Sequence, residues 1–356
     1  MNDVIVIGGG IAGISLAAHL SAHADVLVLE AEAALGYHAS GRSAAMFEET
    51  YGSPSTIELN RASRPAHEAS GFLSPRGLML IGTAANADAF DADMVTMAMT
   101  PLSVSEARRM IPVLNPKVVT RAGHHSAAWD IDTDALIQSF ARTLRANGGR
   151  LQLNAQVTAI SRAGTHWQVT TASEVFTAPV LVNAAGAWAD HIAALADVQP
   201  IGLTPFRRSM ARIPAPGGLD LSRWPMMFGP GETWYAKPDA GALLVSPADE
   251  EPAQPCDAWP DDMVLAEGLA RYSEHVTEPV TRLLSSWAGL RSFSPDRNLT
   301  IGPAPDAPGF FWQAGQGGYG FQTCHAAAQL GADLIVGRAP LIGEKTAQAL
   351  APARFF

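Results

Sequence analysis

The chain has few cysteines, few charged residues and no long apolar run. Only two of its 356 residues are cysteine, and 16% are charged. Cys256 and Cys324 lie far apart and form no CxxC pair, which disfavours a zinc site or a disulfide framework and favours a reducing cytoplasm. Asp, Arg or Gly interrupts each apolar run before it reaches the roughly 18 residues that span a bilayer, so we expect no transmembrane segment. The apolar segment Val4–Ile7 leaves no room for a signal peptide at this end, and we therefore expect a cytoplasmic protein.

Basic residues are also scarce. The chain holds 24 Lys and Arg against 34 Asp and Glu, which gives a net charge of −10. Nucleic acids and anionic membranes bind positive surfaces, so neither is an expected partner. An anionic substrate would need a local cationic pocket. The length, the 47% hydrophobic content and the lack of internal repeats indicate an ordinary globular protein with two domains.

The N-terminal segment predicts a dinucleotide site. The apolar strand Val4–Ile7 leads into a glycine turn and then into a helix with apolar residues at helical spacing. Within the turn, Gly8, Gly10 and Gly13 form a G-x-G-x-x-G pattern, which allows a tight turn, close approach to a pyrophosphate and close helix packing. This pattern is weak evidence alone but strong between a strand and a helix.

Glu30 helps to identify the nucleotide. It ends the next strand, Val26–Glu30, at the distance expected for a carboxylate that binds ribose hydroxyls. An acid there disfavours NADP, whereas NAD and FAD remain. Because further parts of the same domain recur near residues 180 and 310, and an extended flavin must be held at several places, we favour FAD.

The rest of the chain mixes helical and strand periodicities. From Gly36 to Ser55 it is rich in Gly, Ser and Ala, which predicts a long functional loop. The other expected elements are helices over Thr56–Ser70 and Met94–Met110, a helix that starts at Asp130–Asp134 and ends at Asn147–Gly149, strands over Leu78–Ile81, Val180–Asn183 and Phe310–Trp312, a hairpin of Trp234–Lys237 with Leu243–Ser246, and a last helix to Val336.

Four segments carry a family resemblance. They are residues 36–45 (GYHASGRSAA), 182–188 (VNAAGAW), 287–291 (WAGLR) and 316–323 (QGGYGFQT). In order and spacing they resemble the D-amino acid oxidase (DAO) superfamily of FAD-dependent oxidoreductases, and most closely the D-arginine dehydrogenases. The match extends over nearly the whole chain, which makes it much more specific than the glycine pattern.

The resemblance implies an α/β fold with an α+β substrate domain. A Rossmann-like FAD-binding domain would be assembled from residues 1–50, 130–200 and 286–356. A substrate domain with an antiparallel sheet, residues 51–129 and 201–285, would be inserted between these stretches.

The resemblance also implies which residues bind FAD. Ser43, Ala44 and Ala45 would lie along the flavin, and Gly317–Gly320 would open a helix near its pyrimidine end, where a helix N-terminus stabilises the negative charge of reduction. No motif places Cys324 on the flavin, so we expect non-covalent FAD. The full predicted set is Gly8, Gly10, Ile11, Ala12, Gly13, Glu30, Ala31, Arg42, Ser43, Ala44, Ala45, Val157, Ala184, Gly186, Trp188, Gly289, Arg291, Gly317, Gly318, Tyr319, Gly320, Gln322 and Thr323.

By the same resemblance, Arg208 and Arg291 match the arginines that hold a substrate carboxylate. Two guanidinium groups would make a bidentate clamp and fix the Cα over the flavin. Tyr235 and Tyr51 match hydroxyls that reach the carboxylate or the amine. Taken alone, an arginine is more often part of a surface ion pair, and Tyr51 is nearly as well explained as a packed surface tyrosine.

The predicted substrate pocket departs from the D-arginine dehydrogenase pattern. Leu78 stands where a glutamate recognises the guanidinium of D-arginine, and Met46 stands where a histidine is found. These changes favour a neutral or apolar side chain on the substrate. Glu48 would contact a substrate amine or be a solvated loop carboxylate. Gly318 and Gln322 complete the predicted pocket.

The expected reaction is oxidation of a D-amino acid at its Cα–N bond by hydride transfer to flavin N5, which gives an imino acid. We predict no metal site and no catalytic histidine. Whether oxygen, a quinone or a protein carrier accepts the electrons is open, with a preference for dehydrogenase behaviour. Three alternatives remain: an enzyme for glycine, sarcosine or a cyclic imino acid, a flavin-binding subunit of a larger complex, and an NAD-dependent dehydrogenase.

Overall fold

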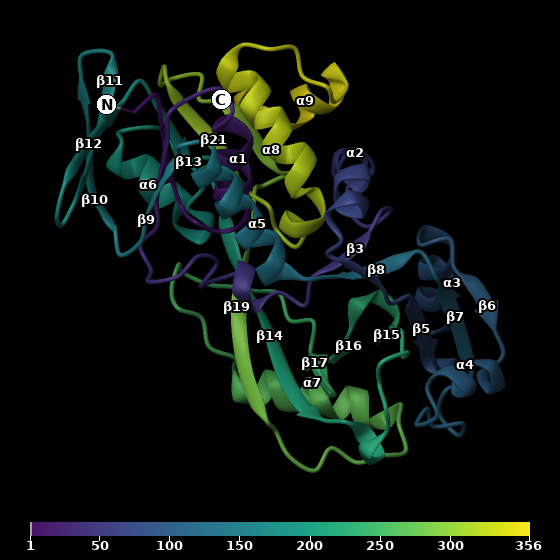
Figure 1. Cartoon of the computed structure of the whole chain (residues 1–356). Coiled ribbons are helices and arrows are strands. Elements are labelled where there is room, and N and C mark those ends of the chain that lie inside the picture. Colours follow the sequence, from purple (N-terminus) through teal and green to yellow (C-terminus); the bar gives the residue numbers. More distant parts are fainter. Residues whose placement is uncertain (1) are drawn as a thin grey trace.

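A six-stranded sheet forms the centre of the half of the molecule that holds both termini (Figure 1). The computed structural model describes residues 2–356. All neighbouring strands of this sheet are parallel except the first pair. In spatial order the strands are β20 (Thr300–Pro303), β21 (Phe310–Ala314), β13 (Val180–Asn183), β1 (Val4–Ile7), β2 (Val26–Leu29) and β9 (Arg150–Gln152).

Both faces of this sheet are covered. Along β1, Val4 and Val6 belong to one core and Ile5 and Ile7 to another, because side chains alternate between the faces of a strand. Helices α1 (Ile11–Leu20), α5 (Thr133–Ala146) and α8 (Gly320–Val336) cover the first face. The second is covered by α6 (Ala189–Leu195) and by the antiparallel strands β10 (Val157–Ala163), β11 (His166–Thr171) and β12 (Val175–Ala178).

A nine-stranded sheet forms most of the other half, where its long strands β14 and β19 run side by side (Figure 1). Its order is β18-β14-β17-β16-β15-β5-β7-β6, with β19 paired to β14. The strands are β5 (Leu78–Gly82), β6 (Thr100–Leu102), β7 (Arg121–His125), β14 (Thr204–Pro214), β15 (Met226–Phe228), β16 (Tyr235–Asp239), β17 (Ala242–Ser246), β18 (Glu251–Pro252) and β19 (Ser285–Phe293).

The two faces of the large sheet have different neighbours. One face packs against α4 (Val104–Met110) and α7 (Asp262–Glu274) in a core that includes Trp234 and Tyr272. The opposite face carries Leu78, Met210, Phe228, Tyr235 and Leu244, and Ala44, Met46 and Trp287 pack against it. This second face is therefore the one turned toward the loop that follows β2.

A small sheet lies between the halves, and one further helix packs on each half. The sheet consists of β3 (Met46–Glu48), β8 (Ala128–Ile131) and β4 (Leu73–Pro75). Helix α2 (Pro54–Ser70) packs on α8 and contacts α9 (Glu344–Leu350), whereas α3 (Ala87–Thr96) contacts β5. No helix among residues 2–356 has both the length and the apolar character needed to cross a membrane.

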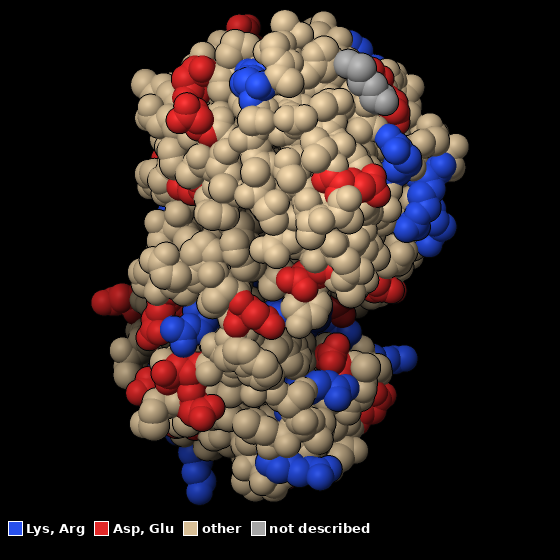
Figure 2. All heavy atoms as spheres, turned by 90° about the vertical axis from the view of Figure 1, so that its left-hand side faces the viewer, with Lys and Arg blue, Asp and Glu red and all other residues tan. Residues whose placement is uncertain are grey.

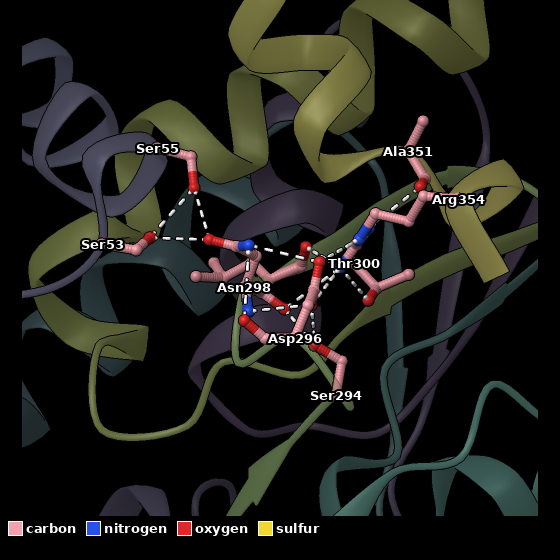
Figure 3. A network of polar contacts seen from close by, with 9 residues as sticks. Ser53, Ser55, Ser294, Asp296, Asn298, Thr300, Ala351 and Arg354 are labelled. Carbon is pink, nitrogen blue, oxygen red and sulfur yellow. Dashed lines mark hydrogen bonds and ion pairs between the residues drawn. The ribbon is translucent and has the colours of Figure 1, made fainter.

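A polar network fixes the C-terminal segment (Figure 3). Arg354 pairs with Asp296 and donates to the carbonyl oxygens of Asn298 and Leu299. The Asn298 side chain in turn accepts from Ser53, ahead of α2. Although burial opposes ionisation, hydrogen bonds from Arg354 and from Asn298 lower the pKa of Asp296 to about 2. The last residues are thus tied to the segment between β19 and β20 and, through Asn298, to the start of α2.

The α/β fold class is confirmed, and so are most expected elements. The helices near residues 56–70, 133–146 and 320–336 and the hairpin of β16 with β17 form as predicted. Residues 94–110 do not form one helix. Helix α3 ends at Thr96, residues Thr100–Leu102 form β6, and Ser103 starts a new helix through a capping box with Glu106.

The glycine-rich segment after β2 is also more ordered than a loop. Residues Met46–Glu48 form β3, and Phe47 is fully buried in the core. The expected boundary at residue 286 lies at the start of β19, whose first residues pair with the end of β14 in the large sheet. The domain limits stay a proposal.

Candidate active site

A cavity of about 620 Å³ runs between the two halves. It extends from the turn between β1 and α1 to the paired strands β14 and β19. Its walls also include the loop after β2, the turn after β13 and the glycine run ahead of α8. A volume of this size lies within the range of cofactor sites.

The turn between β1 and α1 requires its glycines. Gly8 has a φ of +110°, and a Cβ on it would lie 2.4 Å from the carbonyl oxygen of Ala184. A Cβ on Gly13 would lie 2.0 Å from the carbonyl oxygen of Gly8. Only glycine therefore allows α1 to approach the strand this closely.

The start of α1 is suited to an anion. Its N-cap Gly10 supplies no side chain, and its first turn contains no acidic residue. Ile11 N–H donates to Ser40 Oγ at 3.0 Å, which links the helix to the loop after β2. A helix N-terminus with this composition favours phosphate binding.

Glu30 is held in place by the backbone. One carboxylate oxygen accepts from Gly9 N–H at 2.6 Å, and the other accepts from Glu32 N–H at 2.9 Å. The side chain is buried yet lines the cavity. An acceptor fixed in this way is suited to ribose hydroxyl groups.

Arg42 lines the cavity, and its guanidinium group donates hydrogen bonds to other parts of the protein. It donates to the carbonyl oxygens of Ala258 and Ala288, each at 2.9 Å, and pairs with Asp257. The segment around Cys256 and Ala258 thereby covers part of the cavity. Arg42 thus joins this segment to the loop after β2.

The glycine run ahead of α8 is closely packed. A Cβ on Gly317 would lie 2.2 Å from the Phe293 ring, and one on Gly318 would lie 3.1 Å from Arg291 Nη1. Both glycines line the cavity, and α8 begins at Gly320 without a side-chain cap. The N-terminus of α8 therefore lies at the cavity, near Arg291.

Arg208 and Arg291 lie on one face of the large sheet. Arg208 on β14 is opposite Gly289, and Arg291 on β19 is opposite Phe206. Residues two apart on a strand share a face, so the two arginines are diagonal neighbours. Both line the cavity.

Neither guanidinium has an acidic partner in the part of the chain that the structure describes. Arg208 Nε is buried without a hydrogen-bond partner. Arg291 is half-buried. Burial opposes its charged form, but Tyr235, Tyr51 and Glu232 outweigh that effect and raise the pKa of Arg291. Because buried polar groups are nearly always paired, the unpaired Arg208 Nε beside the cavity indicates an anionic ligand, and Arg291 adds a second positive charge there.

Two tyrosines stand beside the arginines. Tyr235 on β16 lines the cavity and is 7% exposed. Tyr51 donates to Glu232 at 3.3 Å and packs against Tyr319, with ring centroids 5.4 Å apart. Burial raises the pKa of the Tyr51 hydroxyl, and Glu232 raises it further. Arg291 and Arg208 lower this pKa by a smaller amount, so the hydroxyl stays neutral.

The residues predicted to surround the substrate side chain are apolar, apart from one buried acid, Glu48. Leu78 and Met46 pack in the cluster that contains Tyr235. Glu48 is 4% exposed, accepts from Thr50 and lies 3.5 Å from His125 Nε2, and its other oxygen is unpaired. Glu48 is therefore a buried carboxylate rather than a solvated one.

Most of the predicted site residues line the cavity. They are Gly8, Gly10, Ile11, Ala12, Glu30, Ala31, Arg42, Ser43, Ala44, Val157, Ala184, Gly186, Trp188, Arg208, Tyr235, Gly289, Arg291, Gly317, Gly318 and Gly320. Those that do not line it are Gly13, Ala45, Met46, Glu48, Tyr51, Leu78, Tyr319, Gln322 and Thr323. In this second group, the side chains of Gln322 and Thr323 donate hydrogen bonds to backbone carbonyl oxygens, those of Tyr51 and Tyr319 respectively.

Sequence reasoning missed several lining residues. Three of them, Ser40, Leu290 and Gln316, lie inside the four segments that carry the resemblance, so they could have been predicted. Cys256 and Ala258 come from an irregular segment without a motif. Only the fold brings that segment to the cavity.

One buried group of possible metal ligands lies elsewhere. The ligand atoms of His67, Cys324 and His325 lie within 4.8 Å of one another. Zinc binds nitrogen and sulfur at roughly 2.0–2.3 Å, so two of its ligands are at most about 4.4 Å apart. Burial lowers the pKa of His325 to about 3, and the rings of His67 and His325 pack against Phe47 and Phe140. We interpret the group as core packing.

The fold and the cavity define a dinucleotide-binding protein with a cationic site at the far end of the cavity. The model of the family of FAD-dependent oxidoreductases (DAO) matches residues 3–334. The chain therefore belongs to this family, and its cofactor is FAD. The uncapped start of α1, the glycine turn and the fixed Glu30 carboxylate fit that cofactor.

Several known proteins are similar to this chain. Glycine oxidase of Pseudomonas putida is 25% identical, over 96% of each chain. Human mitochondrial dimethylglycine dehydrogenase is 24% identical over 91% of this chain but only 41% of its own length. Among solved structures, glycine oxidase from Geobacillus kaustophilus has a TM-score of 0.83 and 22% identity, and the match covers 97% of each chain. That structure supports the fold alone.

Proposed function

We propose that this chain oxidises the Cα–N bond of an amino acid whose carboxylate is held between Arg208 and Arg291. The observation that carries the proposal is a pair of cavity-lining guanidinium groups, neither of which has an acidic partner among residues 2–356. A carboxylate matches a guanidinium in shape and charge, and a bidentate contact fixes its orientation. The reaction class agrees with the chain's place among FAD-dependent oxidoreductases.

The residues of the chain bind and orient the substrate. Arg208 and Arg291 hold the carboxylate, and Tyr235 donates a hydrogen bond beside it. The neutral hydroxyl of Tyr51 orients the carboxylate or the amine. When bound, FAD supplies the hydride acceptor, and the imino acid product hydrolyses in water to a keto acid and ammonia. Positioning carries most of the rate enhancement, so the chain needs no strong base.

We propose a D-amino acid with a neutral or apolar side chain as the substrate. The D-configuration rests on the resemblance to the D-arginine dehydrogenases. The side-chain preference rests on Leu78 and Met46, which pack as an apolar wall near Tyr235. The second candidate is an enzyme for glycine, sarcosine or a cyclic imino acid. The names of two relatives, glycine oxidase and dimethylglycine dehydrogenase, support glycine or an N-methylated glycine within that group. A flavin-binding subunit role stays a third.

The setting of the reaction is part of the proposal. Cys256 and Cys324 are unpaired, which suits a reducing cytoplasm. We propose a quinone or a protein carrier as the electron acceptor, rather than oxygen. Anaerobically reduced enzyme would then be reoxidised faster by a quinone than by air.

The test is anaerobic mixing of the yellow protein with D- and L-amino acids, sarcosine and D-proline, followed by flavin absorbance. We expect bleaching by D-leucine, D-methionine and D-phenylalanine and little by D-arginine. Faster bleaching by glycine or sarcosine would favour the second candidate. A kcat/KM for D-arginine well above those of the apolar D-amino acids would refute the side-chain preference. No bleaching by any compound would refute the proposed activity and leave the FAD fold standing.

A further inference from the structure

Lys237 is a buried cation on the face of the large sheet that is turned toward the cavity. It follows Tyr235 by two residues on β16, so the two side chains share a face. It is 8% exposed, whereas the other two lysines of the chain, Lys117 and Lys345, are on the surface. Neither the proposed clamp nor the dinucleotide site uses this ammonium group.

The ammonium group of Lys237 is directed at the loop after β2. It donates to the carbonyl oxygen of Ala44 and, at 3.3 Å, to that of Ala45. Its Nζ also lies 3.0 Å from Asp130 Oδ1. The other oxygen of Asp130 accepts from Arg76 Nε at 2.7 Å. Two cations and one carboxylate give this cluster a net charge of +1.

The loop that Lys237 holds is strained and borders the cavity. Ala44 lines the cavity, and Ala45 has a φ of +23°, which is rare outside glycine. Trp287 of β19 also holds this loop, because its indole N–H donates to the carbonyl oxygen of Arg42 at 3.2 Å. Two side chains of the large sheet thus fix residues 42–45.

We propose that Lys237 is a positioning residue for FAD, which holds the loop of residues 42–45 so that Ala44 lies against the flavin, and which adds positive charge near it. The inference rests on the proposed flavin contact of Ser43–Ala45. A strained loop persists only where its surroundings over-determine it, and two consecutive carbonyl groups need a donor with several hydrogens. A buried cation also favours the added negative charge of the reduced flavin.

The cluster predicts opposite effects for its two charges. Lys237→Met removes the positive charge and the loop contacts but leaves Asp130 paired with Arg76. It should weaken FAD binding about tenfold or more and make the flavin midpoint potential more negative. Asp130→Asn removes the negative charge and leaves the ammonium in place, so the potential should become more positive. Lys237→Arg should recover part of the FAD affinity.

The experiment compares these variants with Lys117→Met, a matched change at an exposed lysine. FAD affinity comes from titration of the apoprotein, the potential from equilibration with a redox dye, and folding from the apoprotein Tm. If Lys237→Met lowers the Tm while affinity and potential equal those of Lys117→Met, the role is only structural and the proposal is wrong. If Lys237→Met does not fold, Asp130→Asn decides, because an unchanged or more negative potential would overturn the proposal. No amine substrate enters these measurements, so the result is independent of the proposed activity.

Discussion

Arg291→Met tests the proposed clamp most directly. In wild type the guanidinium is half-buried, lines the cavity beside Gly318 and has no acidic partner among residues 2–356. If it makes two charge-assisted hydrogen bonds to the substrate carboxylate, their loss costs about 3 kcal/mol or more. At about 1.4 kcal/mol for each factor of ten, kcat/KM should fall by about a hundredfold or more.

The stability of the same variant should move in the other direction. A cation without a protein partner costs desolvation energy in the substrate-free enzyme, and an apolar side chain of similar length removes that cost. We therefore expect an unchanged or higher Tm, measured by thermal unfolding. Arg212→Met on β14 is the matched control, since Arg212 already pairs with Asp239 at 3.0 Å. A near-normal kcat/KM for Arg291→Met, or a large loss for Arg212→Met, would refute the clamp.

Three other perturbations test separate parts of the structure. Leu78→Glu places an acid in the apolar wall opposite His125, so D-arginine should gain about tenfold or more in kcat/KM relative to D-leucine; an unchanged substrate profile would mean that Leu78 does not face the side chain. Gly13→Ala forces a Cβ to within 2.0 Å of Gly8 O, so the purified protein should lack flavin colour, while Gly343→Ala, which has open space, should stay yellow. The pKa of Asp296, lowered to about 2, means that the folded state favours its ionised form, so Asp296→Asn should destabilise at neutral pH. That difference in unfolding free energy should shrink as pH falls from about 4 to about 2, and a pH-independent difference would contradict it.

The dinucleotide end was predictable because local sequence determines it. Gly8 and Gly13 sit where a strand must turn tightly into a helix, and the contacts of their missing Cβ atoms explain the pattern. The arginine pair needed the family resemblance, since no periodicity distinguishes Arg208 from the surface-paired Arg212 on the same strand. Their shared face follows only from the register of β14 with β19.

Other features lay beyond the sequence because they depend on tertiary contacts. The Met94–Met110 segment has helical composition, yet Ser103 and Glu106 form a capping box that starts a separate helix after β6. The cover over the cavity depends on Arg42 reaching Asp257, which lies 215 residues away. Lys237 contacts Ala44, which lies 193 residues away in the sequence. No local sequence pattern marks either residue, so sequence reasoning could not predict this contact.

The placement of charge is consistent with the proposal that this acidic protein binds an anionic substrate. The chain carries a net charge of −10, but Arg208, Arg291 and Lys237 all lie on the cavity side of one sheet. Lys237 is neutralised in part by Asp130, whereas the two arginines have no acidic partner among the residues that the structure describes. If the proposed clamp holds, the free enzyme bears a desolvation cost at the two arginines, and the substrate carboxylate relieves that cost on binding. A ligand that lacks the carboxylate would leave both arginines unpaired, so the proposed clamp predicts selectivity for amino acids over simple amines.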